Sequence, residues 1–131
     1  MASLGAVEET GTDIRKADRP DRLTITHSVV DGIRVVTVDG EIDHDVKDAL
    51  GDALRSGDGA TPPRIVVDLG GVTFLDSSGI NVFVAAHQAL SGADGWLRLA
   101  GAQPSVLRVL QLVGVDDFIS CHPTVEQALT A

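Results

Sequence analysis

The sequence is short of aromatic residues and cysteine, and it has no long apolar run. Only 3% of its 131 residues are aromatic, so a core must be built from Val, Leu, Ile and Ala. The single Cys121 excludes an internal disulfide and fits a reducing compartment. No apolar run reaches the roughly 18 residues of a spanning helix, and the N-terminus lacks the apolar segment of a secretory signal. We therefore expect a cytoplasmic protein.

Basic residues are also scarce. Ten Lys and Arg stand against 19 Asp and Glu, which gives a formal net charge of −9 at pH 7. This charge disfavours nucleic acid and anionic membrane surfaces as partners. It suits solubility or a basic protein partner. The length fits one domain that can bury a real core.

The first half of the chain predicts a tail, a hairpin and a helix. Residues 1–20 show no periodicity and end at Pro20, which predicts a mobile N-terminal tail before a domain over residues 21–131. Leu23 and Ile25 alternate with threonines, as in a strand with one wet face. Asp31-Gly32 is a two-residue hairpin signal leading to a strand at residues 33–38. Apolar residues at helical spacing then predict a helix over residues 45–55.

The second half alternates between strands and helices. A continuous apolar run predicts a central strand over residues 64–69, and an almost wholly apolar stretch predicts a helix over residues 78–90. A short strand follows near residues 96–99. A helix then opens at Pro104 and stops at Gly114, and a capping pattern at Thr124 opens a last helix. This order predicts an α/β fold in which helices pack against a mixed sheet.

The most informative residues lie between the central strand and the helix after it. We expect the strand to end at Asp68 and a loop containing Gly70-Gly71 to lead into Asp76-Ser77-Ser78-Gly79. Free N–H groups and the dipole at a helix N-terminus favour negative charge, so a phosphate is tolerated there. A serine here could be a switch. Asp and Ser are also the preferred N-cap residues, and on local chemistry alone the plain cap is favoured.

Asp43 is the second candidate, and it also has two interpretations. It precedes the first helix, where a carboxylate caps the helix and compensates the dipole. It also lies in the loop after the second strand. If the second and third strands are neighbours, that loop lies beside the Asp76–Ser78 loop.

Enzymatic and ligand-binding patterns are missing from the sequence. Neither Ser77 nor Ser78 has the glycine two residues earlier that a nucleophile elbow requires. The four histidines show no metal-ligand spacing, and no glycine-rich phosphate-binding fingerprint is present. His87 falls in line with apolar helix positions, so we expect it to be packed and partly buried. We predict no catalytic residue, no metal and no cofactor.

Several motifs together resemble the bacterial anti-sigma factor antagonists, standalone proteins built from one STAS domain. The resemblance covers roughly residues 21–131. It rests on Gly40-Glu41-Ile42-Asp43, on Phe74-Leu75-Asp76-Ser77-Ser78-Gly79-Ile80, on the segment at residues 104–110, and on Gly114-Val115. It implies a STAS-type mixed sheet with an opening antiparallel hairpin followed by β/α units. Many relatives carry Thr-Ala or Ala-Pro where this chain has Val46-Lys47, which bears on the identity of the partner.

The same resemblance implies a partner-switching function. In that family the first serine after the aspartate, here Ser77, is phosphorylated by the anti-sigma factor, which is an ATP-dependent serine kinase. The unphosphorylated antagonist binds that kinase and frees the sigma factor, and a PP2C-type phosphatase resets the cycle. The resemblance places Asp43, Asp76, Ser78 and Gly79 on the partner surface around Ser77.

Three other functions stay open at this point. A standalone STAS subunit of a membrane lipid-transport machine would have the same fold, although such subunits usually lack the Asp-Ser-Ser-Gly phosphoacceptor. A stressosome-like scaffold would assemble into large particles. A serine hydrolase is the enzyme alternative, and a fluorophosphonate probe would detect it.

Overall fold

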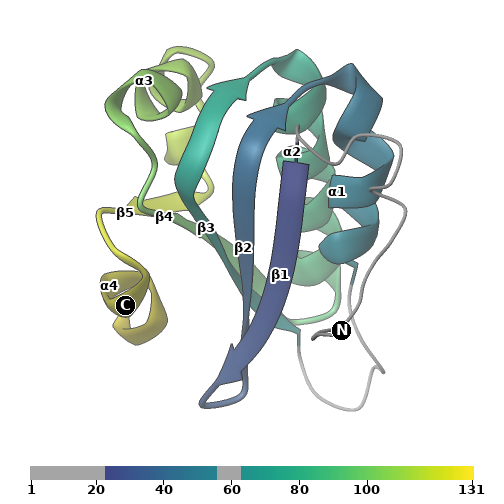
Figure 1. Ribbon diagram of the computed structural model, residues 1–131. Coiled ribbons are helices and arrows are strands. Elements are labelled where there is room, and N and C mark those ends of the chain that lie inside the picture. The colour runs from purple at the N-terminus through teal and green to yellow at the C-terminus, as the bar shows by residue number, and fades with distance from the viewer. Residues whose placement is uncertain (1–22, 56–62) are drawn as a thin grey trace, which may run out of the picture.

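The computed structural model describes residues 23–55 and 63–131 (Figure 1). The tail expected at residues 1–20 lies outside the described residues. Residues 56–62, which connect the first helix to the next strand, also lie outside them. The elements follow in the order β1 (Leu23–Val30), β2 (Ile33–Ile42), the 3-10 helix η2 (His44–Val46), α1 (Lys47–Ala53), β3 (Arg64–Leu75), α2 (Ser77–Gly92), β4 (Trp96–Ala100), α3 (Pro104–Leu112), the 3-10 helix η3 (Val115–Asp117), β5 (Ser120–His122) and α4 (Val125–Thr130).

The five strands form one mixed sheet in the order β1-β2-β3-β4-β5. β1 and β2 pair antiparallel through the predicted turn, where Asp31 and Gly32 both have positive φ, at 53° and 80°. Two positive φ values are those of a type I′ turn, whose twist matches the strands that it joins. Every later pair is parallel. The predicted α/β fold with an opening hairpin is confirmed.

The helices cover the two faces of the sheet unequally. One apolar cluster joins inward residues of β2, β3 and β4, such as Val36, Val67 and Leu99, to buried residues of α1, α2 and α3. The opposite face carries a smaller cluster in which Ala128 of α4 packs on Val66 and Ala100. In Figure 1, α1 and α2 lie behind the sheet and α4 lies on its other side. The main core therefore lies beneath α1, α2 and α3.

Both central strands are longer than the sequence predicts. β3 does not end near Asp68: it continues through Gly70-Gly71 to Leu75 beside an extended β2, with register shifts between Thr37 and Asp39 and between Gly40 and Glu41. The two glycines were interpreted as a loop, and this was wrong. An added Cβ at Gly71 would overlap the exposed carboxylate of its register partner Asp39, which would have to turn away at this irregular part of the ladder.

The helices and one short strand differ in smaller ways from the predictions. The first helix begins as the 3-10 turn η2 before α1, and three apolar residues of the predicted range 45–55, Val46, Leu50 and Leu54, are buried. Gly114 at φ 81° ends the α3 region as predicted, and Thr124 Oγ1 accepts from the Gln127 N–H at 3.1 Å. The three-residue β5 was not predicted. None of the described helices is long and apolar enough to cross a membrane.

Candidate functional site

The N-terminus of α2 is fixed by a side-chain cap. Asp76 has extended backbone angles, and its Oδ1 accepts hydrogen bonds from the N–H of Ser78 at 2.9 Å and of Gly79 at 3.3 Å. Two of the four N–H groups that a helix start leaves without helical partners are thereby satisfied. Ser77 is the first helical residue and is exposed, whereas Ser78 is half-buried. The predicted cap is confirmed, and it presents the Ser77 hydroxyl to solvent.

The loop after β2 lies beside this cap. Ile42 and Leu75, the last residues of β2 and β3, are register partners, and the Asp76 N–H donates to the Ile42 carbonyl oxygen at 3.2 Å. Asp43 therefore follows β2 at the same edge where Asp76 follows β3. The expected side-by-side arrangement of the two loops is confirmed.

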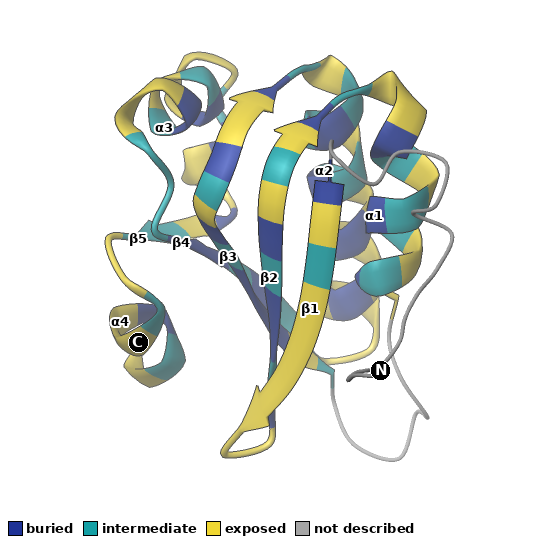
Figure 2. Cartoon of the chain, in the orientation of Figure 1, coloured by how far each residue is buried: buried dark blue, intermediate teal, exposed yellow. Residues whose placement is uncertain are grey.

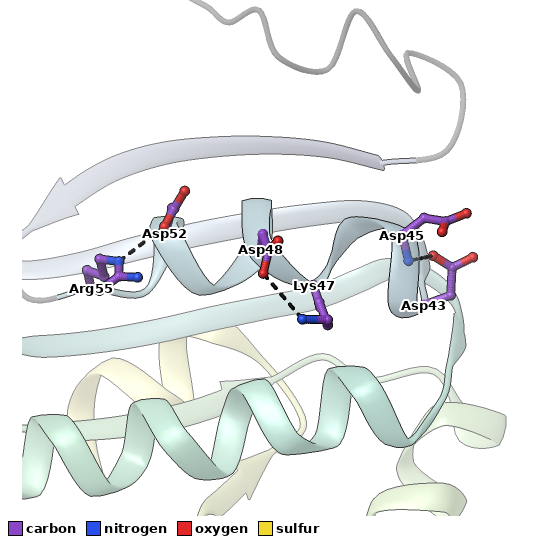
Figure 3. A network of polar contacts seen from close by, with 6 residues as sticks. All are labelled: Asp43, Asp45, Lys47, Asp48, Asp52 and Arg55. Carbon is purple, nitrogen blue, oxygen red and sulfur yellow. Dashed lines mark hydrogen bonds and ion pairs between the residues drawn. The ribbon is translucent and has the colours of Figure 1, made fainter.

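Asp43 is itself a helix cap. Its Oδ1 accepts a hydrogen bond from the Asp45 N–H at 3.0 Å at the start of η2, and Figure 3 shows this contact at the N-terminal end of the helical segment that η2 and α1 form. Lys47 lies one turn further, where its Nζ is 3.4 Å from Asp48 Oδ1. The capping interpretation of Asp43 is confirmed, and it is compatible with a second role because its loop faces the α2 N-terminus.

Gly79 is buried where α2 crosses the ends of β2 and β3. A Cβ at this position would lie 2.5 Å from both Ile42 Cγ2 and Leu75 Cδ1, which are core atoms. The glycine lets the first turn of α2 lie directly on the two strand ends. The packing of Gly79 on Ile42 and Leu75 thereby fixes the position of Ser77 relative to the ends of β2 and β3.

An aromatic side chain that sequence reasoning did not single out is exposed next to the site. Phe74 is 48% exposed, and its register partner on β2 is Glu41. Because Leu75 points into the core, strand alternation turns Phe74 outward. The interpretation of this stretch as a loop concealed the exposure of Phe74, because strand alternation applies here only when β3 continues to Leu75.

The charge around Ser77 is predominantly negative. Glu41, Asp43, Asp45 and Asp76 all come from the ends of β2 and β3 or from the turns that follow them. The helix dipole of α2 supplies partial positive charge at Ser77. This arrangement can hold a phosphate on the helix terminus, while the carboxylates around it repel an approaching anion.

The remaining reactive side chains are dispersed. His87 is half-buried against the Phe118 ring, with ring centroids 5.4 Å apart, which confirms its predicted packing role. Burial and the nearby Asp116 raise the pKa of the Cys121 thiol, which keeps it protonated. Within residues 23–55 and 63–131, no group of three or more His, Cys, Asp and Glu side chains has an arrangement that could hold a metal ion.

The described residues form an α/β fold with a mixed five-stranded sheet, and the exposed Ser77 lies at the capped helix start that follows β3. The family model for the STAS domain matches residues 24–128, and the chain belongs to the STAS-domain family. The resemblance drawn from its motifs is thereby confirmed.

Similar proteins come from mycobacteria. The chain is 31% identical over 116 residues to the anti-sigma-F factor antagonist RsfA of Mycobacterium tuberculosis, covering 84% of this chain and 86% of RsfA. It is 29% identical over 111 residues to RsfB of the same organism, covering 85% of this chain and 90% of RsfB. The crystal structure of an anti-sigma factor antagonist from Mycobacterium paratuberculosis is 35% identical, with a TM-score of 0.73 and coverage of 85% of this chain and 94% of that one.

Proposed function

We propose that this protein is an anti-sigma factor antagonist that binds an anti-sigma factor serine kinase through the surface around Ser77. One observation carries the proposal: an exposed serine at a capped helix N-terminus lies beside the Asp43 loop, in a chain similar to RsfA and RsfB. The partner surface comprises Ser77, Asp43, Asp76 and Ser78. Gly79 contributes from beneath, because it is buried and sets the position of the first turn.

Phosphorylation of Ser77 is the proposed switch. The Ser77 side chain is exposed, whereas Ser78 is half-buried, so Ser77 is the better acceptor on accessibility. A phosphate adds about −1.5 to −2 charges at neutral pH. The helix dipole stabilises such a charge by only about 0.3–1 kcal/mol, and the partner would have to desolvate it next to carboxylates. Binding is therefore lost while the fold persists.

The cycle assigns a role to each partner. The unphosphorylated protein binds the kinase and frees the sigma factor, the kinase then transfers the γ-phosphoryl group of ATP to the Ser77 hydroxyl, and the phosphorylated protein dissociates. A PP2C-type phosphatase hydrolyses the phosphoserine and restores binding. In this cycle the protein is a substrate and a ligand, and it performs no catalysis.

The test is phosphorylation by the cognate kinase with ATP, followed by mass spectrometry. One phosphate is expected, at Ser77, and Ser77→Ala should abolish labelling while retaining kinase binding. Ser78→Ala is the matched control, and it should remain a substrate because only the Ser78 backbone N–H bonds to the cap. A phosphate located on Ser78, or labelling that persists in Ser77→Ala, would overturn the assignment.

A further inference from the structure

The strand β1 at the edge of the sheet carries, within its own residues 23–30, none of the sequence features that usually protect an edge strand. β1 and β5 are the two edge strands, but β5 has three residues and β1 has eight. Natural edge strands of this length usually carry lysine, proline or a bulge, which prevent pairing with another chain. β1 has none of them: its sequence is Leu-Thr-Ile-Thr-His-Ser-Val-Val, and its ladder with β2 is regular.

The side chains of β1 are open to solvent over most of the strand. Residues 26–30 are all exposed, and Val29 is 69% exposed. Figure 2 shows the strand exposed along nearly its whole length, apart from its first residue and a half-buried position. His27 is the one titratable residue of β1, and partial desolvation of its ring together with the positive charge of Arg34 lowers its pKa, so the strand is uncharged at neutral pH.

The turn fixes which backbone groups of β1 point away from β2. In a two-residue hairpin the pair next to the turn, here Val30 and Ile33, exchanges both hydrogen bonds, and hydrogen-bonded pairs then alternate along the ladder. The N–H and C=O groups of residues 23, 25, 27 and 29 are consequently directed toward the open edge. Within the described part of the chain no strand pairs with β1 on that side, so these groups form a row that another strand can extend.

We infer that β1 is a self-docking edge, at which two copies of this chain pair their β1 strands antiparallel about a twofold axis through Thr26. In this register the backbone N–H and C=O groups of Leu23 form hydrogen bonds with those of Val29 in the second copy. The backbone groups of Ile25 pair in the same way with those of His27 in the second copy. It also places Thr26 opposite Thr26 and Thr24 opposite Ser28.

The strand is chemically self-complementary in this register. Thr–Thr and Thr–Ser pairs lie on one face, and Ile–His and Leu–Val pairs lie on the other, all of which are favourable cross-strand neighbours. No like charges are opposed. The contact is small and the chains carry a formal charge of −9 each, so the dimer is weak and is strengthened by salt.

The pairing leaves the proposed kinase-binding end free. The twofold axis reverses the strand direction, so the ends of β2 and β3 that carry Asp43 and Ser77 point in opposite directions in the two copies. Each copy of the dimer can therefore bind a partner. Self-docking is independent of phosphorylation, and its test requires neither kinase nor ATP.

The first experiment is analytical ultracentrifugation of the full chain from micromolar to millimolar concentration. The average mass should rise with concentration and with salt, from the 13.6 kDa of one chain toward twice that value. Thr26→Lys opposes two like charges at the axis and should weaken dimerisation at least about tenfold. A mixture of Thr26→Lys and Thr26→Glu should restore it. Ala89→Lys, at an exposed position of α2, should dimerise as wild type.

A second experiment tests the register with cysteines. In a Cys121→Ser background, Thr26→Cys should form an intermolecular disulfide on mild oxidation, because opposed non-hydrogen-bonded residues have Cα atoms about 4.5 Å apart. Thr24→Cys is the matched control, since its opposite residue is Ser28, and it should cross-link much more slowly. A wild-type chain that stays monomeric throughout, or equal cross-linking of the two cysteine variants, would overturn the inference.

Discussion

Asp76 caps α2 and at the same time fixes Ser77. Its carboxylate accepts from two N–H groups of the first turn, and its own N–H is held by Ile42 of β2. The side chain of Ser77 is left outside this set of bonds, exposed at the helix start. The structural and functional interpretations of the Asp-Ser-Ser-Gly motif are therefore not exclusive, because the cap is what presents the serine.

Asp43 allows the same two roles to be separated by mutation. We expect Asp43→Asn to retain near-wild-type stability, because Asn caps a helix nearly as well as Asp and can still accept from the Asp45 N–H. Loss of the charge should weaken kinase binding or slow phosphorylation, since a desolvated charge pair that loses one partner costs about 2–5 kcal/mol. Thermal unfolding and titration calorimetry measure the two effects.

Asp52→Asn is the control for Asp43. It removes the same charge from the far end of the first helical segment, where Asp52 pairs with Arg55 at 3.1 Å on the surface (Figure 3). Such an exposed pair contributes little, about 0–1 kcal/mol, so neither stability nor binding should change greatly. Equal binding by wild type and both variants would leave Asp43 with its capping role alone.

At the scale of elements, the sequence predicted the helices and the hairpin better than it predicted the ends of the strands. The hairpin followed from Asp31-Gly32 and the α3 boundaries from Pro104 and Gly114, because each of these residues has a local conformational preference. Gly70 and Gly71 have no single preferred conformation of this kind. They permit a loop or a continued strand, and only the pairing of β3 with the extended β2 decides between them.

In the candidate site too, features that depend on local sequence could be predicted, whereas features that depend on pairing between distant segments could be predicted only conditionally or not at all. The cap at Asp76 could be predicted because it is local, and the proximity of Asp43 could be predicted conditionally from parallel strand ends. The exposure of Phe74 could not be predicted, because it depends on the continuation of β3 to Leu75. The three-residue β5 was missed for a related reason, since its pairing with β4 has no periodic pattern long enough to detect.

The packing of α2 on the strand ends gives a prediction for Gly79. Gly79→Ala should destabilise the domain by about 1–3 kcal/mol, because its Cβ would press on Ile42 and Leu75 and neither can move without disturbing the core. Gly92→Ala, in the last turn of the same helix, meets no atom within 4 Å and should be neutral or stabilising by up to about 1 kcal/mol. Urea denaturation compares them. Similar stabilities for the two variants would mean that the first turn of α2 can lift from the sheet.

At the scale of the whole molecule, β2 and β3 carry acidic residues at their C-terminal ends and arginines near their N-terminal ends. The ends of β2 and β3 carry Glu41, Asp43 and Asp76, whereas Arg34 and Arg64 lie at the opposite ends of the same two strands. Parallel pairing of β2 and β3 produces this polarity, because it aligns the starts of both strands and the ends of both strands. A negative charge added at Ser77 therefore lies at the acidic ends of these two strands.

The final prediction tests whether that added charge acts on binding or on the fold. Ser77→Asp, which supplies about one negative charge, should keep a native circular dichroism spectrum, because a carboxylate at a helix N-terminus is favourable. Its affinity for the kinase should fall at least about tenfold, or about 1.4 kcal/mol. Calorimetry with the unphosphorylated partner measures this loss.

Ser105→Asp is the matched control for this charge. Ser105 is exposed in the first turn of α3, so the substitution adds the same charge to a different helix N-terminus, at a residue outside the proposed set of partner-binding residues. It should leave both the fold and the affinity for the kinase unchanged.

Equal weakening of kinase binding by Ser77→Asp and Ser105→Asp would mean that net charge alone opposes binding. Full binding by Ser77→Asp, alongside failure of the phosphorylated protein, would mean that the size and geometry of the phosphate act as the switch. A Ser77→Asp variant without native structure would contradict the interface mechanism, because the charge would then act through folding.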